Sequence, residues 1–169
     1  MAANANLTPT EINNLVAKLE FYKYLVSVTL SGGTATNLGP LKTAPKCEPD
    51  VETRDTTIYE TGSEVQASIL SKNDVKLTIE TESVDAAITL LTGFSKGDNV
   101  LASTAKYTIT LVPITSVATA KTITFTNAYL QPGLSTNLQD ADDANSVTLT
   151  FTCKADATTG KPFTFAAQS

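Results

Sequence analysis

Apolar and polar residues alternate without a break from Ser146 to Lys154, and shorter stretches of the same kind recur along the chain. Strict alternation predicts a β-strand with one buried face and one face in water. The polar positions of these stretches are mostly threonine, a β-branched residue that suits the exposed side of a sheet. The pattern therefore predicts a protein built largely from half-buried strands.

The same alternation predicts further strands at residues 21–30, 65–69, 75–79, 107–111 and 122–126, and a last one at Phe163–Phe165. Ser71-Lys72-Asn73-Asp74 is rich in turn-forming residues and predicts a hairpin between the second and third of these strands. Roughly six to eight strands with two short helices predict a mainly β fold. We expect an antiparallel β-sandwich or barrel with one or two short flanking helices.

Two segments carry helix signals. In the first, Thr8 and Glu11 form a capping box around Pro9, and an apolar stripe follows at helical spacing, formed by Ile12, Leu15, Val16 and Leu19. In the second, Ser83 is the predicted N-cap and Gly93 the predicted stop, and the apolar set between them is Val84, Ala87, Ile88 and Leu91. The stripe of the first helix needs a partner, either the sheet or a neighbouring subunit.

Residues 34–61 show little periodicity and contain three prolines, so they are predicted to form a long loop. Loops of this length in a compact domain are usually functional or disordered. The loop offers both signs of charge to a partner, through Lys42, Lys46, Glu48, Asp50, Glu52, Arg54 and Asp55. The 169 residues fit a single domain, 1–169, with a flexible N-terminal arm at 1–7 and this assembly loop at 34–61.

The formal net charge is −5, the isoelectric point is near 4.6, and the 12 basic residues are scattered singly. A protein that grips nucleic acid needs clustered basic residues, so that class is not predicted. Solubility alone explains the mild acidity. No run approaches the roughly 18 consecutive apolar residues of a membrane-spanning helix. The start, Met1–Leu7, lacks the basic and apolar parts of a signal peptide, so we expect folding in the cytoplasm and no membrane partner.

Candidate chemistry is sparse. The chain has no histidine, the usual base of serine and cysteine nucleophiles, so no catalytic residue is predicted and an enzyme is not expected. Asp140-Ala141-Asp142-Asp143 lacks the glycine and terminal glutamate of a calcium-binding EF-hand loop, so no metal ligand and no cofactor are predicted. Cys153 lies on the apolar phase of its strand and predicts a buried free thiol, while a bridge to Cys47 stays open.

The predicted sheets have open edges with few features to cover them. Natural proteins blunt such edges with lysine, proline or a covering segment. Here the prolines fall mostly in predicted loops and the lysines are few. A ring of identical subunits would cover the edges by pairing them between copies.

A specific order of features extends over roughly residues 20–166. A first strand, a long loop, a hairpin and the helix Val84–Leu91 are followed by a strand ending at Phe125–Leu130 and by the closing segment Leu149–Asp156 with Gly160–Phe163. This order resembles a major tail tube protein of tailed bacteriophages. The predicted helix at 9–20 is less typical of that family.

The resemblance implies a structural virion protein located in the phage tail and assembled in the host cytoplasm. It implies a β-sandwich with a flanking helix, six copies in a ring, and rings stacked into a tube through which DNA passes without specific binding. An inner sheet of each copy would contribute to one continuous lumen barrel, with other tail proteins as further partners. Two alternatives stay open: a related tube of a tailocin or secretion system, or a β-sandwich adhesin or carbohydrate-binding module, although the chain has no tryptophan to bind a sugar.

Two residues are candidates for the lumen wall. Glu80 and Glu82 lie on the polar side of the strand predicted at Asp74–Glu82, and sixfold repetition would turn them into rings of negative charge that repel phosphates. The charged residues of the 34–61 loop are the candidates for contacts between stacked rings.

Overall fold

A computed structural model describes residues 23–57, 65–114, 120–137 and 145–167. The helix predicted from Thr8, the 1–7 arm and the acidic cluster at 140–143 lie outside the described residues. The described part is mainly β, as predicted. It forms one antiparallel sheet of nine strands, in the order β2-β1-β5-β6-β8-β4-β3, with β7 added to β8 and β9 added to β6.

The elements follow the chain in the order β1 Lys23–Leu30, β2 Ala35–Asn37, β3 Lys46–Thr57, β4 Val65–Thr81, α2 Val84–Leu91, the short 3-10 helix η2 Ser103–Ala105, β5 Lys106–Ile114, β6 Lys121–Leu130, β7 Ser135–Asn137, β8 Ser146–Cys153 and β9 Thr164–Ala167. The predicted strands at 107–111, 122–126 and 146–154 are confirmed within one to four residues at their ends. The first predicted strand is β1, which ends before a turn with Gly32 at φ +78°.

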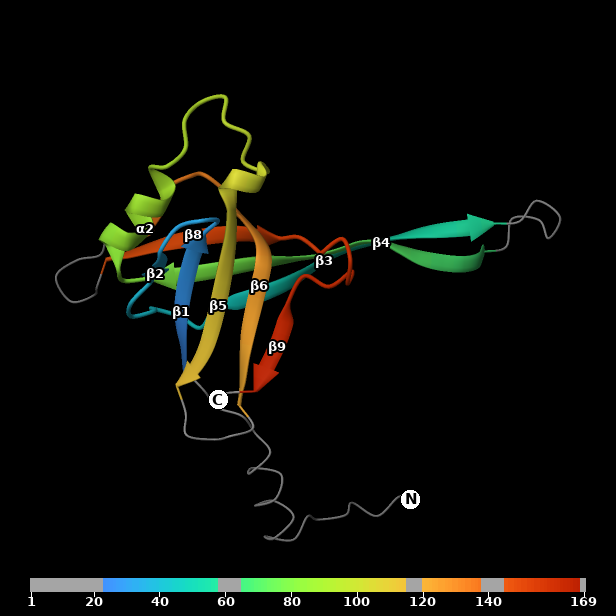
Figure 1. Cartoon of the computed structure of the whole chain (residues 1–169), viewed down its shortest axis with the longest axis horizontal. Helices are drawn as coiled ribbons and strands as arrows, with labels where there is room; N and C mark the ends of the chain where they lie inside the picture. The colour runs from blue at the N-terminus through green and yellow to red at the C-terminus, as the bar shows by residue number, and fades with distance from the viewer. Residues whose placement is uncertain (1–22, 58–64, 115–119, 138–144, 168–169) are drawn as a thin grey trace, which may run out of the picture.

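The sheet folds over on itself into two layers whose strands cross steeply (Figure 1). Strands β1, β5, β6 and β9 form one layer, and β8, β4 and β3 form the other. Strand β6 joins the layers, because its start pairs with β9 at Lys121–Thr124 and its end pairs with β8 at Ala128–Leu130. The β5–β6 register shifts by one residue between Tyr107 and Ile109, which is where a bulge lets the strand bend. The result is a β-sandwich.

The core lies between the layers and is formed by the inward residues of five strands. Its largest fully buried apolar members on these strands are Phe125, Phe151, Leu77, Ile79, Ile109, Leu130, Leu149, Val26, Val28 and Val147, and Leu38 joins them from the segment after β2. The rings of Tyr107 and Phe151 meet edge to face with centroids 5.9 Å apart. Each such side chain contributes roughly 1.5–3 kcal/mol by leaving water. Helix α2 covers one end of β8 and buries Ala87.

Helix α2 has the predicted span, but its ends differ from the prediction. Ser83 occupies the N-cap position without a capping side-chain hydrogen bond. The buried Thr81 hydroxyl oxygen instead accepts the Ser83 backbone N–H at 2.9 Å, and this hydroxyl donates to the Leu38 carbonyl. The helix stops at Thr92, whose N–H donates to the Ile88 carbonyl at 2.9 Å. A glycine in the left-handed conformation is therefore not what ends this helix.

The prediction of a loop over 34–61 is wrong, because this segment contains β2 and β3. The predicted hairpin at 71–74 is also wrong: β4 continues through these residues and pairs with β3 between Val65 and Thr78, with a register shift at Ser71. The two strands project from the body as a long arm (Figure 1). In the arm both faces of the strands meet water, so no buried face imposes alternation. An assembly role for this segment and the single domain stay predictions.

Candidate assembly surfaces

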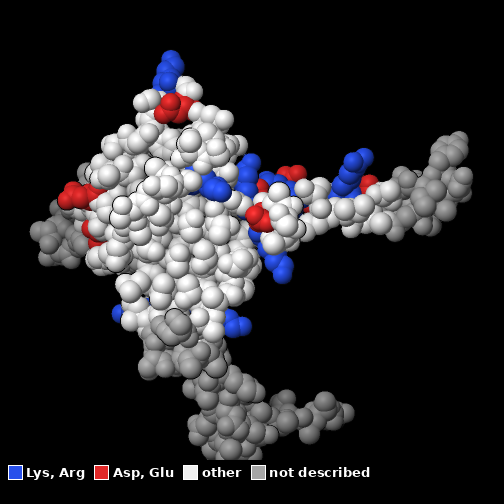
Figure 2. Space-filling model, viewed as in Figure 1, with Lys and Arg blue, Asp and Glu red and all other residues white. Residues whose placement is uncertain are grey.

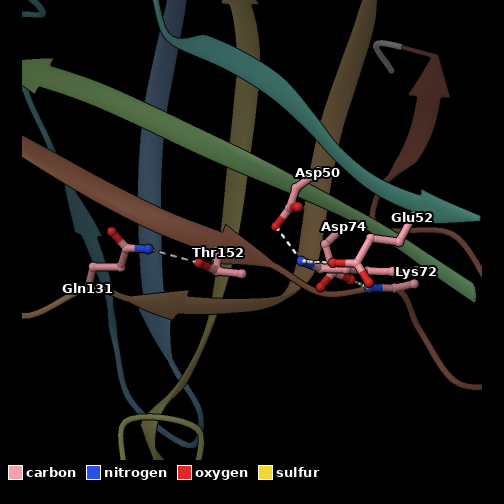
Figure 3. Close-up of polar contacts among 7 residues, drawn as sticks. Asp50, Glu52, Lys72, Asp74, Gln131 and Thr152 are labelled. Carbon is pink, nitrogen blue, oxygen red and sulfur yellow. Dashed lines mark hydrogen bonds and ion pairs between the residues drawn. The ribbon is translucent and has the colours of Figure 1, made fainter.

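One face of the β3–β4 arm is a ladder of charges. The Lys46 ammonium contacts the Glu48 carboxylate at 2.7 Å, and the Lys72 ammonium contacts Asp50 at 2.8 Å and Glu52 at 3.6 Å (Figure 3). The hydrogen bond from Lys72 to Asp50 raises the pKa of Lys72 above its usual value, and the nearby carboxylates add to this. The hydrogen bond from Lys46 lowers the pKa of Glu48. Water and salt screen exposed pairs of this kind, so each contributes little to stability.

The opposite face of the arm carries exposed apolar side chains among polar ones. Cys47, Pro49 and Val51 are paired with Leu77, Val75 and Asn73 of β4, so they continue the core side of that strand beyond the body. Val51 is 52% exposed, and Leu70 further along the arm is also 52% exposed. Two unlike faces on one free-standing hairpin are typical of a surface that a partner covers.

The residues predicted as loop contacts fall into three situations. Lys46, Glu48, Asp50 and Glu52 belong to the charged face of the arm. Arg54 lies exposed opposite Ile69, and Asp55 accepts a hydrogen bond from the Ser68 hydroxyl across the hairpin. Lys42 lies outside the arm, where its backbone N–H donates to the Glu80 carbonyl at 3.0 Å.

Lys72, the central cation of the arm, is not among the contact residues predicted from the sequence, because the residues around it predict a turn. A signal was present: Lys72, Asp74 and Lys76 alternate on one face and stand opposite Glu52, Asp50 and Glu48. Asp74 also accepts the backbone N–H of Ala155 at 3.0 Å, which ties the base of the arm to the end of β8.

Glu80 is half-buried on the outward side of β4, and Glu82 is half-buried directly after the end of β4 at Thr81. The Glu80 carboxylate accepts hydrogen bonds from the hydroxyls of Ser146 at 2.7 Å and Thr43 at 3.4 Å. The Glu82 backbone N–H donates to the Pro40 carbonyl at 3.0 Å. Both residues therefore lie where the segment between β2 and β3 joins the two layers. Their position in a lumen stays a prediction.

The outward face of the β1-β5-β6-β9 layer is uncharged between its strand ends. The strand registers align one row of polar side chains across five strands: Asn37, Ser27, Thr110, Thr124 and Thr164. On the same face, Thr29 and Thr108 form the row on one side of this row, and Leu25 and Val112 form the row on its other side. We call this the hydroxyl face. Figure 2 shows the molecule from the side of the hydroxyl face, and no charged side chain lies over the centre of this face.

This layer has two uncovered edges. β2 pairs only with Ser27–Thr29, and the Leu38 backbone N–H donates to the Val26 carbonyl at 3.0 Å, so the outer edge of Lys23–Leu25 pairs with no strand in the described part of the chain. At the other side, β9 pairs with β6 and leaves its outer edge free of any described strand. Each strand of the layer is antiparallel to its neighbour, so β9 runs antiparallel to β1.

Each edge has an apolar feature. On β9, Phe165 is 57% exposed and lies edge to face against Phe163, with centroids 5.1 Å apart. Beside β1 there is a hollow of about 490 Å³, lined by Lys23, Tyr24, Leu25, Gly39, Pro40, Leu41, Lys42, Thr43, Ala44, Pro45 and Ile114. Sequence periodicity does not single out either feature, because both depend on which strands end at an edge.

A tight turn holds β9 in place. The Asp156 carboxylate accepts the backbone N–H groups of Thr158 and Thr159 at 3.0 Å, and these bonds lower the pKa of Asp156. Gly160 has φ +65°, a conformation that suits glycine, and its carbonyl accepts the Asn73 amide at 2.8 Å. The turn predicted at 158–162 is thereby fixed to the base of the arm.

The two cysteines are free thiols, which settles the bridge left open by the sequence. Cys153 is buried as predicted, and this burial, together with Cys47 and Asp74, raises its pKa to about 12. Among the described residues, no group of three or more cysteine and acidic side chains could hold a metal ion. No helix in the described part is long and apolar enough to cross a membrane.

No protein-family model matches the sequence, and no curated protein matches it. Among solved structures, a chain of the sheath–tube complex of the extracellular contractile injection system PVC, in its extended state, is 15% identical with a TM-score of 0.56, covering 96% of this chain and 100% of that one. A chain from the tube-terminating cap of the anti-feeding prophage is 14% identical with a TM-score of 0.49, covering 99% and 100%. A chain from the tail of an empty GTA particle is 13% identical with a TM-score of 0.48, covering 86% and 96%. The first likeness shows that this chain shares the fold of the PVC chain.

Proposed function

We propose that this chain is a structural tail protein that assembles as hexameric rings stacked into a phage tail tube, with DNA passing through the lumen. One observation carries the proposal: a single sheet layer ends in two uncovered edges that run antiparallel to each other. The fold shared with a chain of a contractile injection system supports it. The number six comes from the resemblance to tail tube proteins.

The two edges suit each other in direction and length. Joining β9 of one copy to β1 of the next continues the antiparallel order across the contact. β9 has four residues, Thr164–Ala167, about the length of the uncovered part of β1. Because the contact uses two different surfaces, repeating it by rotation closes a ring. Pairing also removes the edges that would otherwise invite aggregation.

Joined layers would leave the hydroxyl face as the wall of the channel. The other side of each layer packs on the core of its own copy, so only the hydroxyl face is free to meet the DNA in the channel. An uncharged wall neither attracts nor repels phosphates, and DNA would slide past it. Glu80, on the outward side of the other layer, and Glu82, directly after β4, remain the alternative wall. The arm would then be free to contact a neighbouring ring.

The test is the assembly state of the purified full chain. Sedimentation velocity over a concentration series should show a species of six copies, and negative-stain microscopy should show rings with a central channel. A strict monomer at high concentration, with no rings on grids, would contradict the proposal.

A second candidate is a subunit of the tube of a tailocin or secretion system, favoured by the fold shared with the PVC chain. The two candidates differ in what the native particle contains. Nuclease-protected DNA in purified particles would support the phage tail, and protein cargo without DNA would support the injection system. A β-sandwich adhesin would form no tube at all.

A further inference from the structure

We infer that Phe165 is the anchor of the contact between copies and that the hollow beside β1 of the next copy receives it. This inference rests on the proposed assembly of copies through their sheet edges. It names a specific residue and its receptor, so it can fail while ring formation itself is upheld.

Phe165 is unusual because its side of the strand is the core side. It stands opposite Ile123, which packs against the core, yet more than half of Phe165 is exposed. The Phe165 ring packs edge to face against the Phe163 ring. The Phe163 ring in turn packs edge to face against the ring of buried Phe125, with centroids 5.9 Å apart. Held in this way, the ring would lose little freedom on binding.

The receptor is an apolar recess at the opposite edge. Tyr24, Leu25, Pro40, Leu41 and Pro45 supply most of its apolar lining, with the two lysines Lys23 and Lys42 among the other residues around it. Its volume of about 490 Å³ is ample for a phenyl ring. Aromatic residues seated in such pockets are the usual hot spots of protein interfaces.

Strand register brings the two together. Phe165 is level with Ile123, Leu111 and Val26 in adjacent strands. Pairing β9 with the next β1 at this level would put Phe165 beside Val26 of that copy, where the Val26 carbonyl already accepts the Leu38 backbone N–H. The stagger that a closed barrel requires shifts the pairing along the strands, and a shift of two residues brings Phe165 beside Tyr24, which lines the hollow.

Two complementary variants test the contact. Phe165→Ala removes the anchor and keeps the hollow, and should weaken self-association roughly 30-fold, the scale of an interface hot spot. Ala44→Trp keeps the anchor and fills the hollow, and should also stop ring formation. An equimolar mixture should then form a dimer of one copy of each, because only one functional pair of surfaces remains.

Sedimentation velocity measures all three samples, with circular dichroism to check folding. Leu134→Ala, at an exposed apolar residue between β6 and β7, is the matched control and should assemble like the unchanged protein. Rings from folded Phe165→Ala at unchanged concentration would overturn the inference and leave the proposed function standing. So would a mixture that stays monomeric while the unchanged protein forms rings. An unchanged protein that never assembles would overturn both.

Discussion

Strand β4 passes through two environments, and their contrast explains much of this molecule. From Val75 to Thr81 it lies in the body, paired with β8 along this stretch and with β3 as far as Thr78, and Leu77 is fully buried. From Val65 to Asp74 it has only β3 beside it, and Leu70 is half exposed. A two-stranded hairpin alone is marginally stable in water. The body therefore stabilises itself, while the arm depends on its ion pairs and on whatever covers its apolar face.

The largest expected effect compares one truncation in each environment. Leu77→Ala should destabilise the protein by about 2–5 kcal/mol, because it opens a cavity in a packed core. Leu70→Ala should change the free energy of unfolding by no more than about 0.5 kcal/mol, because its side chain is already in water. Urea unfolding of both variants measures the difference. Equal losses would show that the arm has its own packed interior.

The cysteines report the same contrast chemically. Cys153 in the body should resist a thiol reagent at pH 8, because burial shields its sulfur and its pKa of about 12 leaves almost no thiolate. Desolvation also raises the pKa of Cys47, at the base of the arm, but its side chain is exposed, so it should react at least tenfold faster. Mass spectrometry after timed labelling measures both rates, and addition of urea should make the two equal. Fast labelling of Cys153 in the folded protein would contradict its burial.

The body also offers two rival channel walls. Thr110→Lys with Thr124→Lys should make assembled tubes retain DNA in a salt-dependent manner, because the new charges would face the channel. Glu80→Lys with Glu82→Lys should leave retention unchanged, since Glu80 lies on the outward side of the other layer and Glu82 follows directly after β4. Filter binding at two salt concentrations compares the pairs. The reverse result would make Glu80 and Glu82 the wall.

The smallest effect is the pH dependence of the arm. The pKa of Glu48 is lowered, so its contribution is present above the unfolded value of about 4.3 and is lost as the pH falls through the folded value. The pKa of Lys72 is raised, so its contribution is present below about 10.4 and is lost as the pH rises further. A spin label at Thr56→Cys, in a Cys47→Ser background, should gain mobility at both extremes. A label on the body should not.

Local pattern was enough to predict the mainly β class, the helix Val84–Leu91 and the longer strands of the body, but not the three-residue strands β2 and β7. Strand β8 shows why: it has one buried and one wet face, and every residue from Val147 to Cys153 reports which face it occupies. The same rule failed for β3, because a strand without a buried face needs no alternation of apolar and polar residues. It also failed at Ser71–Asp74, where turn-forming residues stay extended because β3 supplies their backbone partners.

The sequence by itself thus determined which segments have a face to bury, the burial of Cys153 and the scarcity of catalytic side chains. Only the tertiary structure decided which strands are neighbours and which are edges. The alignment of Ser27, Thr110 and Thr124 in one row, the exposure of Phe165 and the ion pairs of Lys72 all follow from pairing between distant segments. Alternation reports a residue's own face, whereas register and edges are properties of two strands together, and no single strand encodes them.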